Sequence, residues 1–129
     1  MAQVKIFGAR AHLSARRQAI SDCIHGVACD VLGLPPDKRF HRFLPLDPED
    51  FFHPADRSDA YTVIEISMFE GREAATKRRF LERLMAALSN EVGIAVQDIE
   101  ITLFETPKAN WGIRGQVADK LTLDYKVET

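Results

Sequence analysis

Residues 61–105, YTVIEISMFEGREAATKRRFLERLMAALSNEVGIAVQDIEITLFE, contain the strongest secondary-structure pattern in the chain. Apolar and polar residues alternate over residues 61–69 and again over residues 97–105, which predicts two strands. Between them the apolar period becomes helical over residues 76–93, with a face formed by Phe80, Leu81, Leu84, Met85, Ala87, Leu88 and Val92. A strand–helix–strand unit of this kind holds its two strands parallel, with a right-handed crossover.

The first half of the chain has the same organisation. Val4 and Ile6 alternate with polar residues before Gly8, which predicts a strand. Ser14 is expected to cap a helix that ends at Gly33, and KRFHRFLPL (residues 38–46) alternates as a second strand. A shift of about 60 residues superimposes the two patterns. It pairs Ile20 with Phe80, Ile24 with Leu84, Ala28 with Leu88 and Leu34 with Ile94.

The two matching patterns therefore predict one α/β (α+β) domain, residues 1–129, built from two repeats at about residues 2–46 and 62–107. The simplest product is a four-stranded sheet with both helices on one face. Residues 47–60 are expected to form an irregular crossover loop. The tail, residues 108–129, has a low apolar content, so we expect it to pack on a neighbouring subunit.

Composition excludes several classes of function. The 129 residues carry a net charge of −2, which gives no reason to expect nucleic acid as a partner. No apolar run has the length of a signal peptide or a membrane span, so we expect a soluble cytoplasmic protein. The four histidines lack metal-ligand spacing and no cofactor motif appears, so neither a metal nor a cofactor is expected. His25 is interpreted as a satisfied core histidine, and Cys23 and Cys29 as buried thiols.

Several motifs in this order resemble the tautomerase superfamily. EGR, the following helix and strand, and NWG resemble a 4-oxalocrotonate tautomerase protomer, while LGLPPDKRF, DPED and RSDAYTVIEIS resemble the longer members near malonate semialdehyde decarboxylase. The resemblance covers roughly nine-tenths of the chain. It implies a homotrimer of double β-α-β protomers. It also implies isomerase or lyase chemistry on a small keto or enol carboxylate, with an N-terminal proline as base.

Ala2 stands where the family has its catalytic proline. A small residue after Met1 normally permits removal of the methionine, which would leave the primary amine of Ala2 at the catalytic position. An α-amino group titrates near pH ~8, so it can act as a base. Proline contributes rigidity and basicity that alanine lacks, and we therefore expect the family chemistry to be weak, altered or absent.

Arg72, in EGRE, matches the turn arginine with which the family binds a substrate carboxylate. A guanidinium suits a carboxylate because it offers paired hydrogen bonds, although a solvated turn arginine is the alternative. The decarboxylase pattern has a second arginine where this chain has Glu70, which disfavours decarboxylation. Arg10 is the equivalent of Arg72 in the first repeat. It would line the same pocket or a pseudo-symmetric one, or lie on the surface.

Four further residues belong to the predicted substrate site. The decarboxylase pattern has a catalytic aspartate where Lys38 stands, with Asp37 one residue away, and the alternative for Asp37 is a turn aspartate. Lys38 and Arg39 beside the two turn arginines would make a cationic pocket for an anion. Arg57 corresponds to an arginine before the third strand of the long members.

Trp111 matches the aromatic residue that walls the family's pocket, and a subunit-interface anchor is an equally good interpretation.

Two hypotheses remain. The chain is a tautomerase-like enzyme that uses the amine of Ala2 as base and Arg72 as carboxylate ligand. Alternatively, it is a non-catalytic trimer that keeps an anion pocket and has lost the base. The departures from the family pattern at Ala2, Glu70 and Lys38 favour the second.

Overall fold

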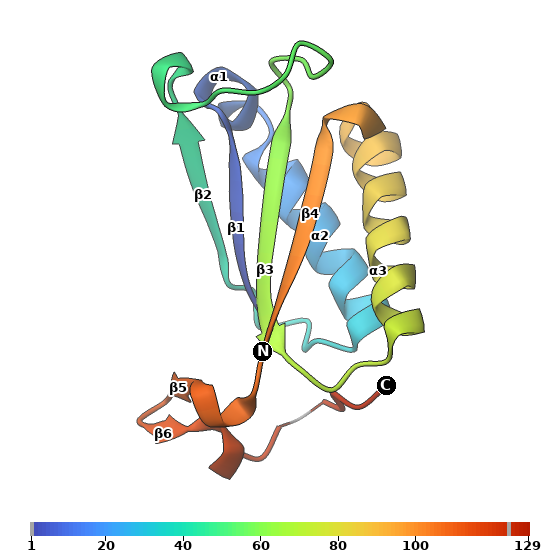
Figure 1. The fold of residues 1–129 in the computed structure, drawn as a ribbon. Helices are drawn as coiled ribbons and strands as arrows, with labels where there is room; N and C mark the ends of the chain where they lie inside the picture. The colour runs from blue at the N-terminus through green and yellow to red at the C-terminus, as the bar shows by residue number, and fades with distance from the viewer. Residues whose placement is uncertain (1, 124) are drawn as a thin grey trace.

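The sheet positions every other element of the chain (Figure 1). The computed structural model describes residues 2–123 and 125–129. Within them β1 (Ala2–Ala9), β2 (His41–Leu46), β3 (Thr62–Phe69) and β4 (Ile99–Thr106) form a four-stranded sheet in the order β2-β1-β3-β4. β1 is parallel to β2, β3 is parallel to β4, and the central pair β1 and β3 is antiparallel. This is the predicted pair of β-α-β units.

Both long helices cover the same face of the sheet. α2 (Arg17–Leu32) and α3 (Ala74–Ala87) pack over it, and a π-helical turn at Leu88–Val92 extends α3. Each helical segment ends in a left-handed glycine, Gly33 at φ 69° and Gly93 at φ 82°. These are the two glycines that the sequence predicted as helix ends. The predicted fold class, with two helices on one face of four strands, is thus confirmed.

Strand alternation separates the core from the open face. Val4, Ile6, Ile64 and Ile66 are nearly or completely buried and point towards the helices, where Ile24, Leu84 and Leu88 close the core. Phe7, Leu44, Val63 and Phe104 lie on the opposite face, because each is one residue out of phase with that buried set. No helix covers this second face in the described part of the chain (Figure 1).

The predicted helix start at Ser14 is wrong. A short helix, α1 (Arg10–Ser14), follows β1 directly, and α2 begins only at Arg17 without a side-chain cap. Leu13 is completely buried and packs over Gly8, where an added Cβ would lie 3.1 Å from the leucine side chain. Burial of Leu13 therefore fixes the first helical turn, and the chain bends at Ala15 and Arg16 before α2.

The C-terminal region lies at the end of the sheet where β1 begins (Figure 1). β5 (Gly112–Ile113) and β6 (Gln116–Val117) form a small hairpin, and the chain then returns to the start of α3. There the carbonyl oxygen of Thr129 accepts hydrogen bonds from the backbone nitrogen of Glu73, at 3.1 Å, and from Oγ1 of Thr76, at 2.7 Å. Contact of this tail with a neighbouring subunit stays a prediction.

Short 3-10 helices complete the chain at Pro48–Asp50, Val96–Asp98, Lys108–Asn110 and Ala118–Lys120. None of the helices formed by the described residues is long and apolar enough to span a bilayer.

Candidate active site

A cavity of about 230 Å³ opens beside the first residue of β1, and we refer to it as the Ala2 cavity. Its floor is the buried face of the sheet at Ala2, Val4 and Ile66. α2 supplies one wall and the segment after it supplies another, while the C-terminal region closes the cavity. The remaining lining residues are Ile24, His25, Ala28, Leu32, Leu34, Pro35, Lys38, Phe40, His41, Phe80, Arg114, Thr122, Leu123 and Tyr125.

The polar groups around this mainly apolar floor are cations and neutral donors. Lys38 and Arg114 contribute positive charge, and His25 and His41 contribute two imidazole rings whose centroids lie 6.2 Å apart. The cavity therefore suits a small organic anion with an apolar part, because cations attract its charge and the floor excludes water.

His25 is a core histidine whose hydrogen bonding is satisfied, as the sequence predicted. It is buried, and its Nε2 lies 2.8 Å from the carbonyl oxygen of Pro36. A carbonyl oxygen only accepts, so Nε2 of His25 carries the hydrogen and donates it. The sulfur of Cys29 lies 3.7 Å from the same nitrogen. Cys23 is buried as predicted, whereas Cys29 is only partly buried.

Arg72 lies at the same end of the sheet but is not among the described residues that line the Ala2 cavity. Its side chain is 5% exposed, and Nη1 donates to the carbonyl oxygen of Phe69 at 3.3 Å. Nε and Nη2 have no hydrogen-bond partner within residues 2–123 and 125–129. Burial lowers the pKa of this guanidinium, while Glu105 and Glu128 oppose that shift. The result is a buried cation with an unused hydrogen-bonding edge.

Trp111 packs against the end of β3 rather than in the cavity wall. Its ring lies 4.9 Å from that of Phe69, in a small cluster with Ala118 and Val127. In one protomer Trp111 thus anchors the hairpin against the end of β3.

Arg10 and Arg57 lie at the opposite end of the sheet from Ala2. β1 separates Ala2 from Arg10, whose Nε pairs with Oδ1 of Asp47 at 3.0 Å. Arg57 pairs with Asp56 at 2.7 Å and lies 5.7 Å from the centre of the Tyr61 ring. Arg10 lines a separate groove between α1 and the crossover loop, together with His12, Arg16, Phe51 and His53. A single protomer therefore does not bring these arginines to Ala2.

The segment between α2 and β2 contains the other three predicted site residues. Lys38 reaches the Ala2 cavity, whereas Asp37 is exposed in the preceding turn. Arg39 turns outwards, and its Nη1 contacts Oδ1 of Asp22 at 2.6 Å and Oγ of Ser21 at 3.2 Å. Of the predicted set, the structure brings together Ala2 and Lys38.

His41 and Arg114 also line the cavity, although the sequence did not predict either as a site residue. His41 sits opposite Val4 in the parallel pairing of β1 and β2. The alternation of His41 and Phe43 in the predicted strand was the available signal, because it places His41 on the face of the buried residues. The position of Arg114 depends on the path of the C-terminal hairpin, which could not be predicted from the sequence.

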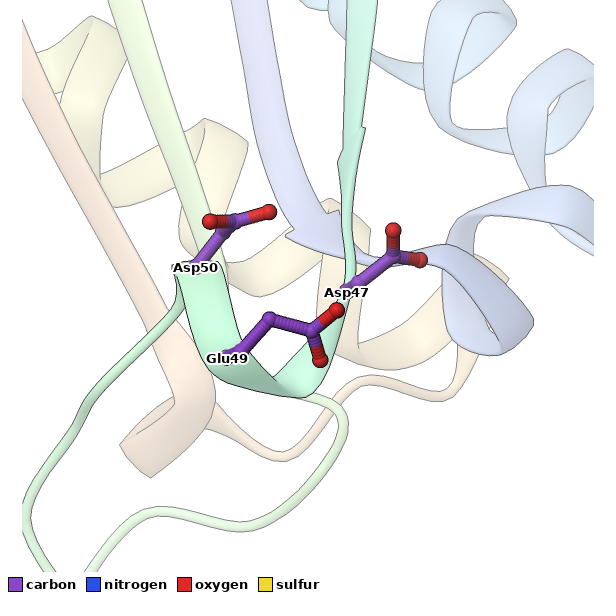
Figure 2. Close-up of side chains that lie close together, drawn as sticks. All are labelled: Asp47, Glu49 and Asp50. Atoms are coloured by element: carbon purple, nitrogen blue, oxygen red, sulfur yellow. The ribbon is translucent and has the colours of Figure 1, made fainter.

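Three carboxylates form the one group of potential metal ligands that the described residues contain (Figure 2). Ligand atoms of Asp47, Glu49 and Asp50 lie within 4.8 Å of one another in the turn after β2. Glu49 and Asp50 are exposed, and Asp47 already accepts a hydrogen bond from Arg10. The group could hold a cation, but it lies at the other end of the sheet from the Ala2 cavity.

Comparison with known proteins gives consistent matches. The family model described as "Tautomerase enzyme" matches residues 38–114. A 2-hydroxymuconate tautomerase from Pseudomonas putida is 37% identical over 57 residues, which are 44% of this chain and 90% of that protein.

Solved structures match over most of the chain. Malonate semialdehyde decarboxylase superposes with a TM-score of 0.78 at 23% identity, over 89% of this chain and 93% of that one. A fused 4-OT, described as an asymmetric trimer, superposes with a TM-score of 0.79 at 17% identity, over 91% and 96%. At these identities the superpositions show the shared fold.

Proposed function

Since the chain belongs to the tautomerase enzyme family, we propose that its tautomerase-like function is exerted on a small keto or enol carboxylate. The observation that carries this proposal is the position of Ala2 in the floor of a cavity that is also lined by Lys38 and Arg114. Names of similar proteins support the substrate class, because 2-hydroxymuconate is an enol dicarboxylate and malonate semialdehyde is an oxo carboxylate.

The proposed base is the amine that removal of Met1 would free on Ala2. Met1 lies outside the described residues. The amine takes the hydroxyl proton of the enol, the oxygen becomes a carbonyl, and the double-bond electrons accept a proton from the amine at carbon. The enol and the ketone thus interconvert without a cofactor. The apolar floor at Val4 and Ile66 supports this role, because desolvation lowers the pKa of an amine towards neutrality.

Cations hold the carboxylate in this proposal. Lys38 and Arg114 are the cationic residues that line the cavity, and Arg72, with its unused hydrogen-bonding edge, lies at the same end of the sheet. Asp37 and Arg39 flank Lys38 in the sequence and would take part from outside the cavity lining, since neither residue lines the cavity. Arg10, Arg57 and Trp111 would take part through neighbouring subunits, since within one protomer they lie outside the cavity.

We further propose a cytoplasmic homotrimer. The open face of the sheet carries Phe104 and Leu44 at 47% and 36% exposure, which favours burial against other subunits. A fused 4-OT of the same fold is described as a trimer. The free thiols of Cys23 and Cys29 fit a reducing compartment.

The alternative function is anion binding without catalysis. Three departures from the family pattern favour it. Alanine replaces the N-terminal proline, Glu70 replaces an arginine, and Lys38 replaces an aspartate. Both functions use the same cavity, so the amine distinguishes them.

The experiment begins with the intact mass of the purified full chain, which establishes whether Ala2 is the first residue. Turnover of 2-hydroxymuconate is then followed by absorbance for the unmodified chain, Arg72→Ala and Ala2→Pro. We expect measurable turnover that falls in Arg72→Ala, and a rise of about tenfold or more in Ala2→Pro. A freed Ala2 without turnover, and with ligand binding unaffected by Arg72→Ala, would refute the enzyme. No turnover in the unmodified chain that is restored in Ala2→Pro would favour the binding protein that has lost its base, and no gain in Ala2→Pro would mean that the pocket has been repurposed.

A further inference from the structure

A chain of hydrogen bonds leads from the surface to the wall of the Ala2 cavity. Oδ1 of Asp22 accepts from Nη1 of Arg39 at 2.6 Å, and the same Nη1 donates to Oγ of Ser21 at 3.2 Å. Oγ of Ser21 lies 2.7 Å from Nδ1 of His41. Each link joins residues from α2 to residues of β2 or the segment before it, so the packing of α2 on the sheet sets the geometry.

The hydrogen positions follow from the donors. Arg39 can only donate, so Ser21 Oγ accepts from it and has its own hydrogen left. Within the described hydrogen bonds, the acceptor that Ser21 Oγ reaches is Nδ1 of His41. Burial, together with Arg39 and His25, lowers the pKa of His41 to about 4, so the ring is neutral near pH 7. A neutral ring that accepts at Nδ1 carries its hydrogen on Nε2.

The surroundings of His41 indicate which way its Nε2 points. The ring lines the Ala2 cavity and also an outer groove formed with Arg17, Gln18, Ser21, Arg39 and Phe43. Ser21 and Arg39 line the outer groove and not the cavity, so the Nδ1 edge of the ring faces outwards. In the strand pairing His41 lies beside Val4, which is part of the cavity floor. Nε2 is left on the cavity side, and it is not among the buried atoms without a partner.

We propose that His41 is a ligand-binding residue of the Ala2 cavity, where its Nε2–H donates a hydrogen bond to the keto or enol oxygen of the bound carboxylate. This inference rests on the proposed function and names a residue for the substrate oxygen that gains charge when the enol proton leaves. Nε2 of His25 is already used on Pro36, so that nitrogen does not compete for this role. A neutral donor stabilises the developing oxyanion and leaves proton transfer to the amine.

Two measurements test this role on the full chain. In a long-range ¹H–¹⁵N spectrum of histidine-labelled protein, we expect His41 to have an unprotonated Nδ1 and a protonated Nε2. Pyruvate, a stable keto carboxylate, should shift Nε2 of His41 saturably and leave His53, at the other end of the sheet, unchanged. In the turnover of 2-hydroxymuconate, His41→Phe should lose about tenfold or more in kcat/KM, because the donor is gone.

Three variants keep the result interpretable. His41→Gln retains an N–H donor and should recover part of the loss. Ser21→Ala keeps the ring but removes its orienting hydrogen bond, so it should show mixed tautomers and an intermediate loss. His53→Gln is the matched control and should behave like the unmodified chain. If His41→Phe does not fold, Ser21→Ala and the spectrum of the unmodified chain still decide the question.

The outcomes separate this inference from the proposed function. Normal kcat/KM in folded His41→Phe, a hydrogen on Nδ1, or pyruvate shifts at His25 without shifts at His41 would refute the role of His41 alone. If the unmodified chain neither binds pyruvate nor turns over 2-hydroxymuconate, the proposed function fails and the role of His41 fails with it.

Discussion

Arg10 and Arg72 are equivalent in the sequence repeat, each following the first strand of its unit, and their surroundings are opposite. Arg10 is exposed and pairs with Asp47. Arg72 is buried with one long hydrogen bond and an unused edge. The sequence could pair the two arginines, but the burial of Arg72 depends on the C-terminal region folding back on α3, which local patterns do not encode. A buried cation that forms no salt bridge with the described residues costs stability, and function is a reason to keep it.

We expect Arg72→Met to raise the free energy of unfolding by about 1 kcal/mol, because methionine fills similar space without a desolvated charge. The same variant should bind pyruvate more weakly. Urea denaturation at pH 7.5 measures the first effect, and Arg10→Met, at an exposed position, is the control with little change. Destabilisation of Arg72→Met would mean that the guanidinium has a structural partner in solution.

His41 should also make folding sensitive to acid. Its pKa is lowered from 6.5 to about 4 by burial, Arg39 and His25, with Asp22 opposing the shift. Below pH 6.5 the unfolded chain therefore binds a proton that the folded chain refuses, so stability falls as the pH drops from 6.5 towards 4. Between pH 7 and pH 5 the free energy of unfolding should fall in both proteins. We expect the fall in His41→Gln to be smaller than in the unmodified chain by about 1 to 2 kcal/mol, a figure that allows for the partial exposure of His41. Equal losses in urea titrations would contradict this.

At the scale of elements, periodicity was sufficient for most of the fold. The helical period of residues 76–93 and the end at Gly93 identified α3, and the same rule at Gly33 identified the end of α2. α1 was missed because the residue that fixes it, Leu13, is recognised only by its contact with Gly8. Likewise the cavity combines residues from β1, α2, β2 and the C-terminal region, so only its Ala2 and Lys38 were predicted, from the family pattern.

The break between α1 and α2 can be tested with a pair of glycine substitutions. Gly8→Ala would place a Cβ 3.1 Å from the Leu13 side chain, so we expect a loss of about 1 kcal/mol in the free energy of unfolding. Gly26→Ala, inside α2 with no described atom within 4 Å of the new Cβ, should gain about 0.5 to 1 kcal/mol. Thermal or urea denaturation compares them, and equal effects would contradict the packing of Leu13 over Gly8.

At the scale of the whole molecule, the open face of the sheet is the feature that one protomer leaves unexplained. We expect light scattering to give three times the 14.5 kDa of the chain. Phe104→Asp, on the open face, should shift the protein to smaller species, because a buried carboxylate opposes association. Phe52→Asp is the matched control, since Phe52 is 88% exposed on the crossover loop away from the sheet. A monomeric unmodified chain would refute the trimer.

The lack of an α-amine at the start of the second unit limits the number of ligands that each chain can bind. Thr62 begins β3 as Ala2 begins β1, but its nitrogen lies within a peptide bond, and its hydroxyl donates to the carbonyl oxygen of Ala60. The second unit therefore has no α-amine to offer, whatever happens at Met1. Titration calorimetry with pyruvate should accordingly give a stoichiometry of one equivalent per chain, although the chain contains two matching halves.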